Sequence, residues 1–253
     1  MTTQTNQTNQ TEQVAKNSLS AKQKMILVLC SLAAVVIIAV TSVLGTVAYL
    51  TSSAAVSNVF TIGNVGIVMT ESKVDIDGVP VDDGATQVDT NTYHLVPNKT
   101  YTKDPHIVVA DGSEDSFLFV LVRNDIQGIA DPNKASIADQ MAANGWAKYT
   151  KASTGWIYVY VGMNDEGNSR VDPTDADKTT VDTFAYTATP VKSGTYYLFR
   201  EFSIAPGADI STYGAAKITL TAVAIQDEGF NGNVAKAWEA VVATYPYIHT
   251  GSN

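Results

Sequence analysis

The stretch Ser116-Phe-Leu-Phe-Val-Leu-Val-Arg-Asn124 decides the fold. Successive side chains of a β-strand point to opposite sides of the sheet, so this stretch has two distinct faces. Both faces are largely apolar, which is typical of a strand buried on both sides. The stretch therefore predicts a central strand of a β-sandwich. One face carries Phe117, Phe119, Leu121 and Arg123, and the other carries Leu118, Val120 and Val122.

The same alternation recurs along the chain. In Trp156–Val161 the aromatic residues occupy every second position, and Lys217–Gln226 alternates in the same way. Many short apolar segments separated by Gly, Asp, Asn and Pro predict an all-β protein, specifically an antiparallel β-sandwich. The predicted strands are Asn58–Thr70, Val74–Ile76, Tyr93–Val96, His106–Ala110, Ser116–Asn124, Trp146–Thr150, Trp156–Gly162, Thr183–Pro190, Thr195–Ile204 and Lys217–Gln226.

Two short helices interrupt this pattern. Asp131-Pro132 predicts the start of the first, which has Ile137 and Met141 on one face. Asn233 is a suitable N-cap for the second, which Pro246 ends. We expect both helices to be additions to the β-sandwich.

An apolar run extends from Met25 to Leu50. About 20 apolar residues suffice for a helix to cross a membrane, so residues 25–49 are predicted to be a signal peptide or a transmembrane helix. Lysines precede the run and none follows before Lys73, which predicts a cytoplasmic N-terminus and an exported remainder. The length suits an uncleaved anchor, whereas small residues near Ala48 suit cleavage, so the sequence leaves both possibilities open.

Composition narrows the function further. The whole chain has a net charge of −9, and the part after the apolar run is more acidic still, since three lysines but only one glutamate precede it. Such a surface repels nucleic acid. Cys30 is the only cysteine and lies inside the apolar run, so the exported part has no disulfide and no thiol nucleophile.

No catalytic or metal-binding motif is recognisable. His94, His106 and His249 are not in a His-Glu-x-x-His arrangement, and neither a nucleophile elbow nor a phosphate-binding loop occurs. We therefore expect a protein that is not an enzyme and has no cofactor. The loop from Asn164 to Lys178 is rich in carboxylates but lacks the order of an EF-hand. Its weak calcium candidates are Asp172, Asp175 and Asp177.

The segment that follows the apolar run, Thr51 to Gly63, is uncharged and has high β-propensity from Val56 onward. It is either a tether that leads into the first strand or an extended strand that pairs with a sheet edge on a neighbouring molecule. The residues that would mediate this strand donation are Val56, Asn58, Val59 and Phe60.

Several short motifs resemble the TasA/camelysin family of exported proteins of Gram-positive bacteria, whose signal is cut by a SipW-type signal peptidase. Gly45-Thr-Val-Ala-Tyr-Leu50 is similar to the end of the family's signal, and Asn58-Val-Phe-Thr-Ile-Gly-Asn-Val65 is similar to its first core strand. Leu95–Pro105 resembles a family turn that ends in Lys-Asp-Pro. Ile218–Gln226 followed by Ala237-Trp238 resembles the family's closing strand and helix.

The resemblance implies a jelly-roll-like sandwich and, as in the biofilm members, fibres built by N-terminal strand donation. Cleavage would fall within Val47, Ala48, Tyr49 and Leu50, by a SipW-like signal peptidase. The camelysin peptidase activity is not expected here, because the metal ligands are missing. The expected regions are a disordered cytoplasmic leader (1–24), a signal peptide or transmembrane helix (25–49), an N-terminal donor strand (50–60) and a β-sandwich domain (61–253).

The resulting expectation is a secreted or cell-surface structural protein of the extracellular matrix that associates with itself, and with the membrane before cleavage. The alternative is a membrane-anchored surface module that binds carbohydrate or protein through its aromatic faces. A secreted metallopeptidase is less consistent with the sequence.

Overall fold

A computed structural model describes Lys22, Met25 and residues 51–52, 57–164, 166–167, 170 and 188–250. The chain divides into two units, Met1–Thr46 and Val47–Asn253, and the fold described below is that of the second unit. No helix among the described residues has the length and apolar character needed to cross a membrane. The predicted signal or transmembrane segment lies outside the described residues except for Met25.

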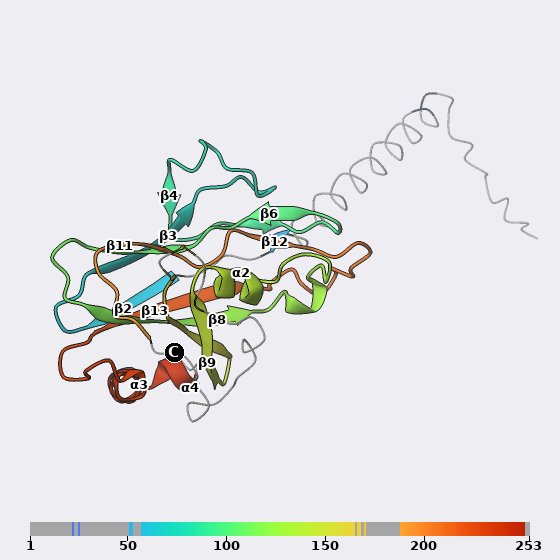
Figure 1. Cartoon of the computed structure of the whole chain (residues 1–253). Coiled ribbons are helices and arrows are strands. Elements are labelled where there is room, and N and C mark those ends of the chain that lie inside the picture. The colour runs from blue at the N-terminus through green and yellow to red at the C-terminus, as the bar shows by residue number, and fades with distance from the viewer. Residues whose placement is uncertain are drawn as a thin grey trace, which may run out of the picture. The chain divides into compact units, whose positions relative to one another are not determined.

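The described part is mostly β, as the sequence predicts (Figure 1). The strands are β1 (Thr51–Ser52), β2 (Ser57–Ile62), β3 (Ile67–Ser72), β4 (Gln87–Val88), β5 (Tyr93–His94), β6 (Thr100–Thr102), β7 (His106–Val109), β8 (Ser116–Asn124), β9 (Trp146–Ala152), β10 (Gly155–Tyr160), β11 (Gly194–Tyr197), β12 (Glu201–Ser203) and β13 (Ile218–Gln226). The helices are the 3₁₀ turn η1 (Gln127–Ile129), α2 (Ile137–Ala143), α3 (Val234–Thr244) and α4 (Tyr247–Thr250).

Two larger sheets organise these strands. The order in the five-stranded sheet is β2-β13-β8-β10-β9, and that in the four-stranded sheet is β11-β7-β3-β4. Two short pairs, β1-β5 and β12-β6, complete the pairing. Among the described strands, every ladder is antiparallel except that between β2 and β13, which is parallel. The predicted antiparallel pairing therefore holds for all the described ladders but one, because β2 runs along the edge of the five-stranded sheet in the same direction as β13.

The five-stranded sheet is buried on both faces. Leu118, Val120 and Val122 of β8 share a core cluster with Ile67 and Met69 of β3. The opposite face of β8 packs in a second cluster with α3, and Figure 1 shows α3 and α4 across the sheet from β3 and β4. The two faces predicted for β8 are thus confirmed. The second cluster includes Phe117, Phe119, Leu121, Ala237, Trp238 and Val241.

Two predicted strands are each divided in the structure. Asn58–Thr70 becomes β2 and β3, because Gly63, with a φ of +88°, turns the chain out of one sheet and into the other. Thr195–Ile204 becomes β11 and β12, which pair with different partners. Period-two patterning continues across both breaks, so it could not locate them.

Helix α2 departs from the prediction at its start, and α3 departs from it in its role. Helix α2 begins after Ser136, whose side chain and Asp139 form a capping box, and not at Asp131. Asn233 caps α3 as predicted, by accepting a hydrogen bond from the Lys236 amide at 3.0 Å. Since Ala237, Trp238 and Val241 of α3 are buried against the five-stranded sheet, this helix is part of the core and not an addition.

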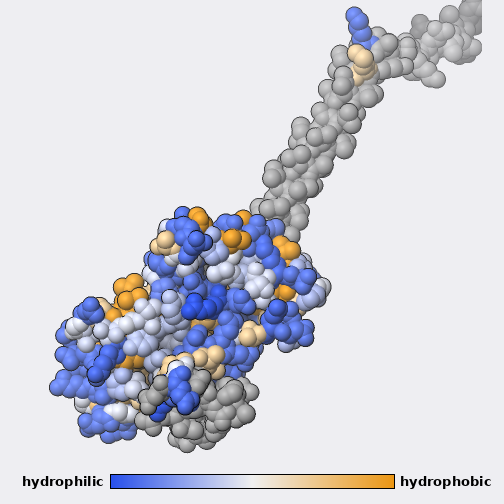
Figure 2. Space-filling model, turned by 45° about the horizontal axis from the view of Figure 1, so that its top comes forward, coloured by the Kyte–Doolittle hydropathy of each residue, from blue (hydrophilic) through white to orange (hydrophobic). Residues whose placement is uncertain are grey.

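The face of the molecule drawn in Figure 2 is mostly hydrophilic. Figure 2 shows a face dominated by polar residues with small, separate apolar patches. The exposed apolar residues include Val68 and Val108, which lie opposite each other on β3 and β7. One exposed pair of this kind is small compared with the apolar patches that mark binding surfaces, so it does not by itself indicate one.

Replacement of Trp238 by alanine tests the structural role of α3. The indole is 6% exposed and its ring centroid lies 5.1 Å from that of Phe119. We expect Trp238→Ala to lower the free energy of unfolding by about 3–5 kcal/mol, as for other buried aromatic truncations. Chemical denaturation measures this. The exposed Lys236→Ala on the same helix is the control, with an expected change within about 0.5 kcal/mol, and equal effects for the two variants would contradict the assignment.

Candidate functional site

The segment predicted to be donated lies in the chain's own sheet. Asn58, Val59 and Phe60 belong to β2, and their Cα partners on β13 are Thr221, Ala222 and Val223. Val56 and the predicted cleavage residues Val47, Ala48, Tyr49 and Leu50 lie outside the described residues. The strand also extends to Ile62, two residues beyond the boundary predicted from the sequence.

Strand β2 is held from both sides of the sheet. The Phe60 ring centroid lies 5.0 Å from that of Tyr245 and 5.2 Å from that of Tyr247. The Tyr245 hydroxyl donates a hydrogen bond to the Thr61 carbonyl at 3.0 Å. Val59 packs on the opposite side, against the core shared by the two sheets. Alternate side chains of β2 therefore fill two different apolar environments, which fixes its register.

The end of β2 is defined by close contact with β13. A Cβ atom at Gly63 would lie 2.3 Å from Oε1 of Gln226, the last residue of β13. The same oxygen accepts a hydrogen bond from the Asn64 amide at 3.1 Å. Beyond this point the chain passes to β3 in the other sheet. β2 is an edge strand of its sheet, and residues 63–66 connect it to β3.

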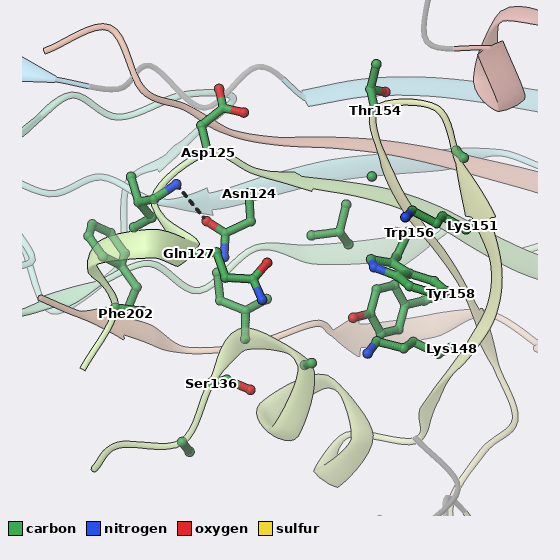
Figure 3. Close-up of a pocket in the computed structure, with 18 of the residues that line it drawn as sticks. Asn124, Asp125, Gln127, Ser136, Lys148, Lys151, Thr154, Trp156, Tyr158 and Phe202 are labelled. Carbon is green, nitrogen blue, oxygen red and sulfur yellow. Dashed lines mark hydrogen bonds between the residues drawn. The ribbon is translucent and has the colours of Figure 1, made fainter. Parts of the chain in front are cut away.

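A second feature is a cavity of about 360 Å³ beside β10. It is lined by the half-buried Trp156, by Asn124 and Gln127, and by residues of the α2 region (Figure 3). The amines of Lys148 and Lys151 lie 4.9 Å and 5.9 Å from the Trp156 ring centroid. The cavity thus combines an aromatic side chain with amide and charged groups, a composition that suits a small polar ligand.

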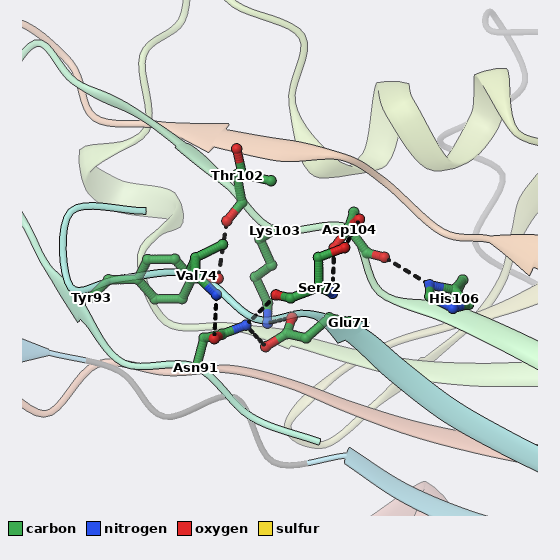
Figure 4. A network of polar contacts seen from close by, with 9 residues as sticks. All are labelled: Glu71, Ser72, Val74, Asn91, Tyr93, Thr102, Lys103, Asp104 and His106. Carbon is green, nitrogen blue, oxygen red and sulfur yellow. Dashed lines mark hydrogen bonds and ion pairs between the residues drawn. The ribbon is translucent and has the colours of Figure 1, made fainter. Parts of the chain in front are cut away.

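The third feature is a buried polar network that joins three segments (Figure 4). The Lys103 amine donates to Oε2 of Glu71 at 2.5 Å, and the two side chains are 1% and 3% exposed. The Asn91 amide donates to Oε1 of Glu71 at 3.0 Å and to the Ser72 carbonyl at 2.8 Å. Its own oxygen accepts from the Val74 amide at 3.0 Å.

Neighbouring groups close this network. Both carboxylate oxygens of Asp104 accept hydrogen bonds from Ser72, from its amide at 2.8 Å and its hydroxyl at 2.7 Å. Burial lowers the pKa of the Lys103 amine, an effect that the nearby Glu71 carboxylate opposes. Burial also raises the pKa of the Tyr93 hydroxyl, with a further contribution from Glu71. The segment from β3 to β7 therefore has a low-dielectric interior with polar groups in fixed positions.

The sequence analysis did not single out this network. Asn91 follows Glu71 by 20 positions and Lys103 follows it by 32, so no short motif contains all three residues. One signal was available: Tyr101 and Lys103 are two apart in an extended segment, and Tyr101 is fully buried. Period two places the lysine on the same inward face.

The described residues hold no group of three His, Cys, Asp or Glu side chains able to bind a metal. The weak calcium candidates Asp172, Asp175 and Asp177 lie outside the described residues. His106 is buried and lies on β7, with its Nδ1 atom 3.1 Å from the Asp104 carbonyl. His94 is half-buried at the end of β5. Comparisons with protein families, curated proteins and solved structures found no match to this chain.

Tyr101 gives the network region a measurable pH dependence. Its hydroxyl donates to the His94 carbonyl and accepts from the Val96 amide, both at 2.6 Å. Burial raises the pKa of Tyr101 to about 12, from an ordinary value of 10.0. In the unfolded chain this tyrosine ionises at lower pH than in the folded chain. Its contribution to stability is therefore complete below pH 10 and is lost as the pH rises toward 12.

We expect Tyr101→Phe to lower the free energy of unfolding at pH 7 by about 1–2 kcal/mol, because the Val96 amide loses its partner. The decrease in stability between pH 10 and 12 should be smaller in the variant than in the wild type. Urea denaturation across this pH range measures both effects. Identical slopes for the two proteins would show that Tyr101 keeps an ordinary pKa in the folded state.

Proposed function

We propose that this chain is an exported structural protein that assembles into extracellular fibres by donating its N-terminal strand after signal cleavage. The parallel pairing of β2 with β13 carries the proposal. The order and pairing of the larger sheets are compatible with the jelly-roll-like sandwich that the resemblance to the TasA/camelysin family implies. In this proposal the protein acts at the cell surface or in the extracellular matrix, and its principal partner is another copy of itself.

The geometry of β2 supports donation in a specific way. β2 is an edge strand, so its removal would leave the main-chain groups of Leu220–Ile225 without partners along one side. An unpaired strand edge with apolar faces is a template for another extended segment. The β2 of a second copy has the same Val59 and Phe60 side chains and would fit the same two apolar environments. Strand exchange between identical copies therefore preserves every contact of β2.

The chain also offers a point of exchange. Gly63 is the first residue of the connection from β2 to β3 and adopts a positive φ, so a change of backbone direction at this residue meets little steric resistance. Cleavage near Ala48 and Tyr49 by a SipW-like signal peptidase would free the N-terminal end of the segment. Until then the apolar run would hold β2 near the membrane. Val56, Asn58, Val59 and Phe60 are the residues proposed to carry the donation.

A disulfide between β2 and β13 distinguishes exchange from pairing within one chain. Val59 and Ala222 are directly opposite, so a Val59→Cys/Ala222→Cys variant can form this bond. The processed form would have no other cysteine, since Cys30 is the only one in the chain. If strands are donated, each disulfide of the oxidised double variant links two copies, and the filaments should give a series of covalent multimers on a non-reducing gel.

Each single-cysteine variant is a matched control, because it can link at most two copies. Reduction should collapse the multimers to monomers. If the oxidised double variant runs only as a monomer while filaments are present, the strand remains in its own chain and donation is contradicted.

The cavity beside Trp156 favours a second candidate function, a surface module that binds carbohydrate. The half-buried Trp156 ring lines this cavity and can stack on a sugar ring, and the side chains of Asn124 and Gln127 can bond to hydroxyl groups. In this alternative the apolar run stays as a membrane anchor. The proposal of fibre assembly is preferred, because it accounts for β2 and the apolar run together.

Tryptophan fluorescence tests the carbohydrate candidate. Trp146 and Trp238 are buried, so a soluble oligosaccharide is expected to change mainly the signal of Trp156. Trp156→Ala should weaken binding at least about tenfold, the effect of losing about 1.4 kcal/mol, whereas Lys192→Ala on the exposed surface should leave it unchanged. Absence of any response across a panel of oligosaccharides in the wild type would reject this function.

A further inference from the structure

The buried Glu71–Lys103 ion pair includes a third side chain, Asn91, which a salt bridge does not need. Their residues are 2%, 6% and 1% exposed. A buried ion pair loses much of its attraction to desolvation, and apolar residues of similar volume are often as stabilising. The amine and the carboxamide also bond to different oxygens of one carboxylate, and Figure 4 shows the two groups converging on it.

The orientation of Asn91 follows from its partners. One side-chain atom receives a hydrogen bond from the Val74 amide, so it must be the oxygen. The other faces the Glu71 carboxylate and the Ser72 carbonyl, so it must be the nitrogen. The carbonyl of Asn91 is thus polarised by a backbone N–H donor, while its nitrogen lies against a group that can supply a proton. These are the two requirements for attack on an amide carbonyl.

Lys103 provides a matching nucleophile. Its Nζ atom lies against Oε2 of Glu71, which can take up a proton from it, and burial lowers the pKa of the amine although Glu71 opposes this effect. With the shared proton on the Glu71 carboxyl, the Nζ atom has a free electron pair and is held by the same residue that holds the amide. A desolvated lysine beside a proton-transfer group is a recognised form of activated nucleophile.

We propose that Lys103 and Asn91 form an intramolecular isopeptide bond, with Glu71 as the proton-transfer group. Nζ attacks Cγ of Asn91, and the bond between Cγ and Nδ2 breaks. The amine gives up one of its two protons, and Nδ2 gains one through Glu71 and leaves as ammonia. The product is a secondary amide between the side chains. No oxidant, metal or cofactor takes part.

The bond has a clear structural consequence. It closes a loop from Asn91 to Lys103 that contains β5 and β6, and it fixes this loop beside the end of β3. No cysteine follows Cys30, so a disulfide cannot tie the region. An amide linkage would give a fibre subunit a covalent clamp that does not depend on the redox state of its surroundings.

Peptide mapping of the full chain tests the proposal. Lysine acylation blocks tryptic cleavage after Lys103, so residues 74–99 and 100–123 should be recovered as one branched peptide. Its mass should be lower than the sum of the two linear peptides by about 17 Da, the mass of one ammonia. Fragmentation should place the branch at Asn91 and Lys103. Recovery of the two segments only as unlinked peptides cleaved after Lys103 would overturn the proposal.

Variants separate this bond from other losses of ammonia, such as succinimide formation at an asparagine. Lys103→Met and Asn91→Ala should each abolish the deficit, and Glu71→Gln should reduce the branched fraction at least about tenfold by removing the proton-transfer group. Lys99→Ala, a partly exposed lysine four residues away, is the matched control and should retain it. A deficit that persists in Lys103→Met would also contradict the bond. The mapping of the wild type remains decisive if a variant fails to fold.

Discussion

Burial of β8 on both faces is the constraint on which the rest of the structure depends. Seven consecutive residues, Ser116–Val122, are buried, which requires a covering layer on each side of the sheet. The four-stranded sheet supplies one layer and α3 supplies the other. Removal of either layer would expose a continuous apolar face of the sheet. Each Å² of apolar surface exposed lowers the free energy of unfolding by about 25 cal/mol. The order of strands around β8 leaves β2 and β9 at the two edges of the five-stranded sheet.

β2 is the strand for which this arrangement matters most to function. It adds to the free side of β13 and inserts Val59 and Phe60 on opposite faces of the sheet. In our proposal those positions are filled by β2 of another copy, which has the same side chains, and the apolar run restrains the segment until the chain is exported and cleaved.

The sequence predicted the central part of the fold well and the site only in part. Ser116–Asn124 coincides with β8, and both of its faces were assigned correctly, because period-two alternation is strongest where both faces are buried. The break at Gly63 was missed, since the apolar pattern continues through it. The Glu71, Asn91 and Lys103 network could not be predicted, because it depends on contacts between segments that only the topology brings together. β2 was recognised as an extended segment, but its parallel pairing with β13 required the structure.

The central claim is that the strand beside β13 comes from a neighbouring copy in the assembled state. A density map of filaments formed by the processed protein tests it most directly, because the connection through Gly63 can be traced. The account predicts that Ser57–Ile62 beside Leu220–Ile225 belongs to the adjacent subunit, in the parallel register seen within one chain. Continuous density from β2 through Gly63 into β3 of the same subunit would contradict it.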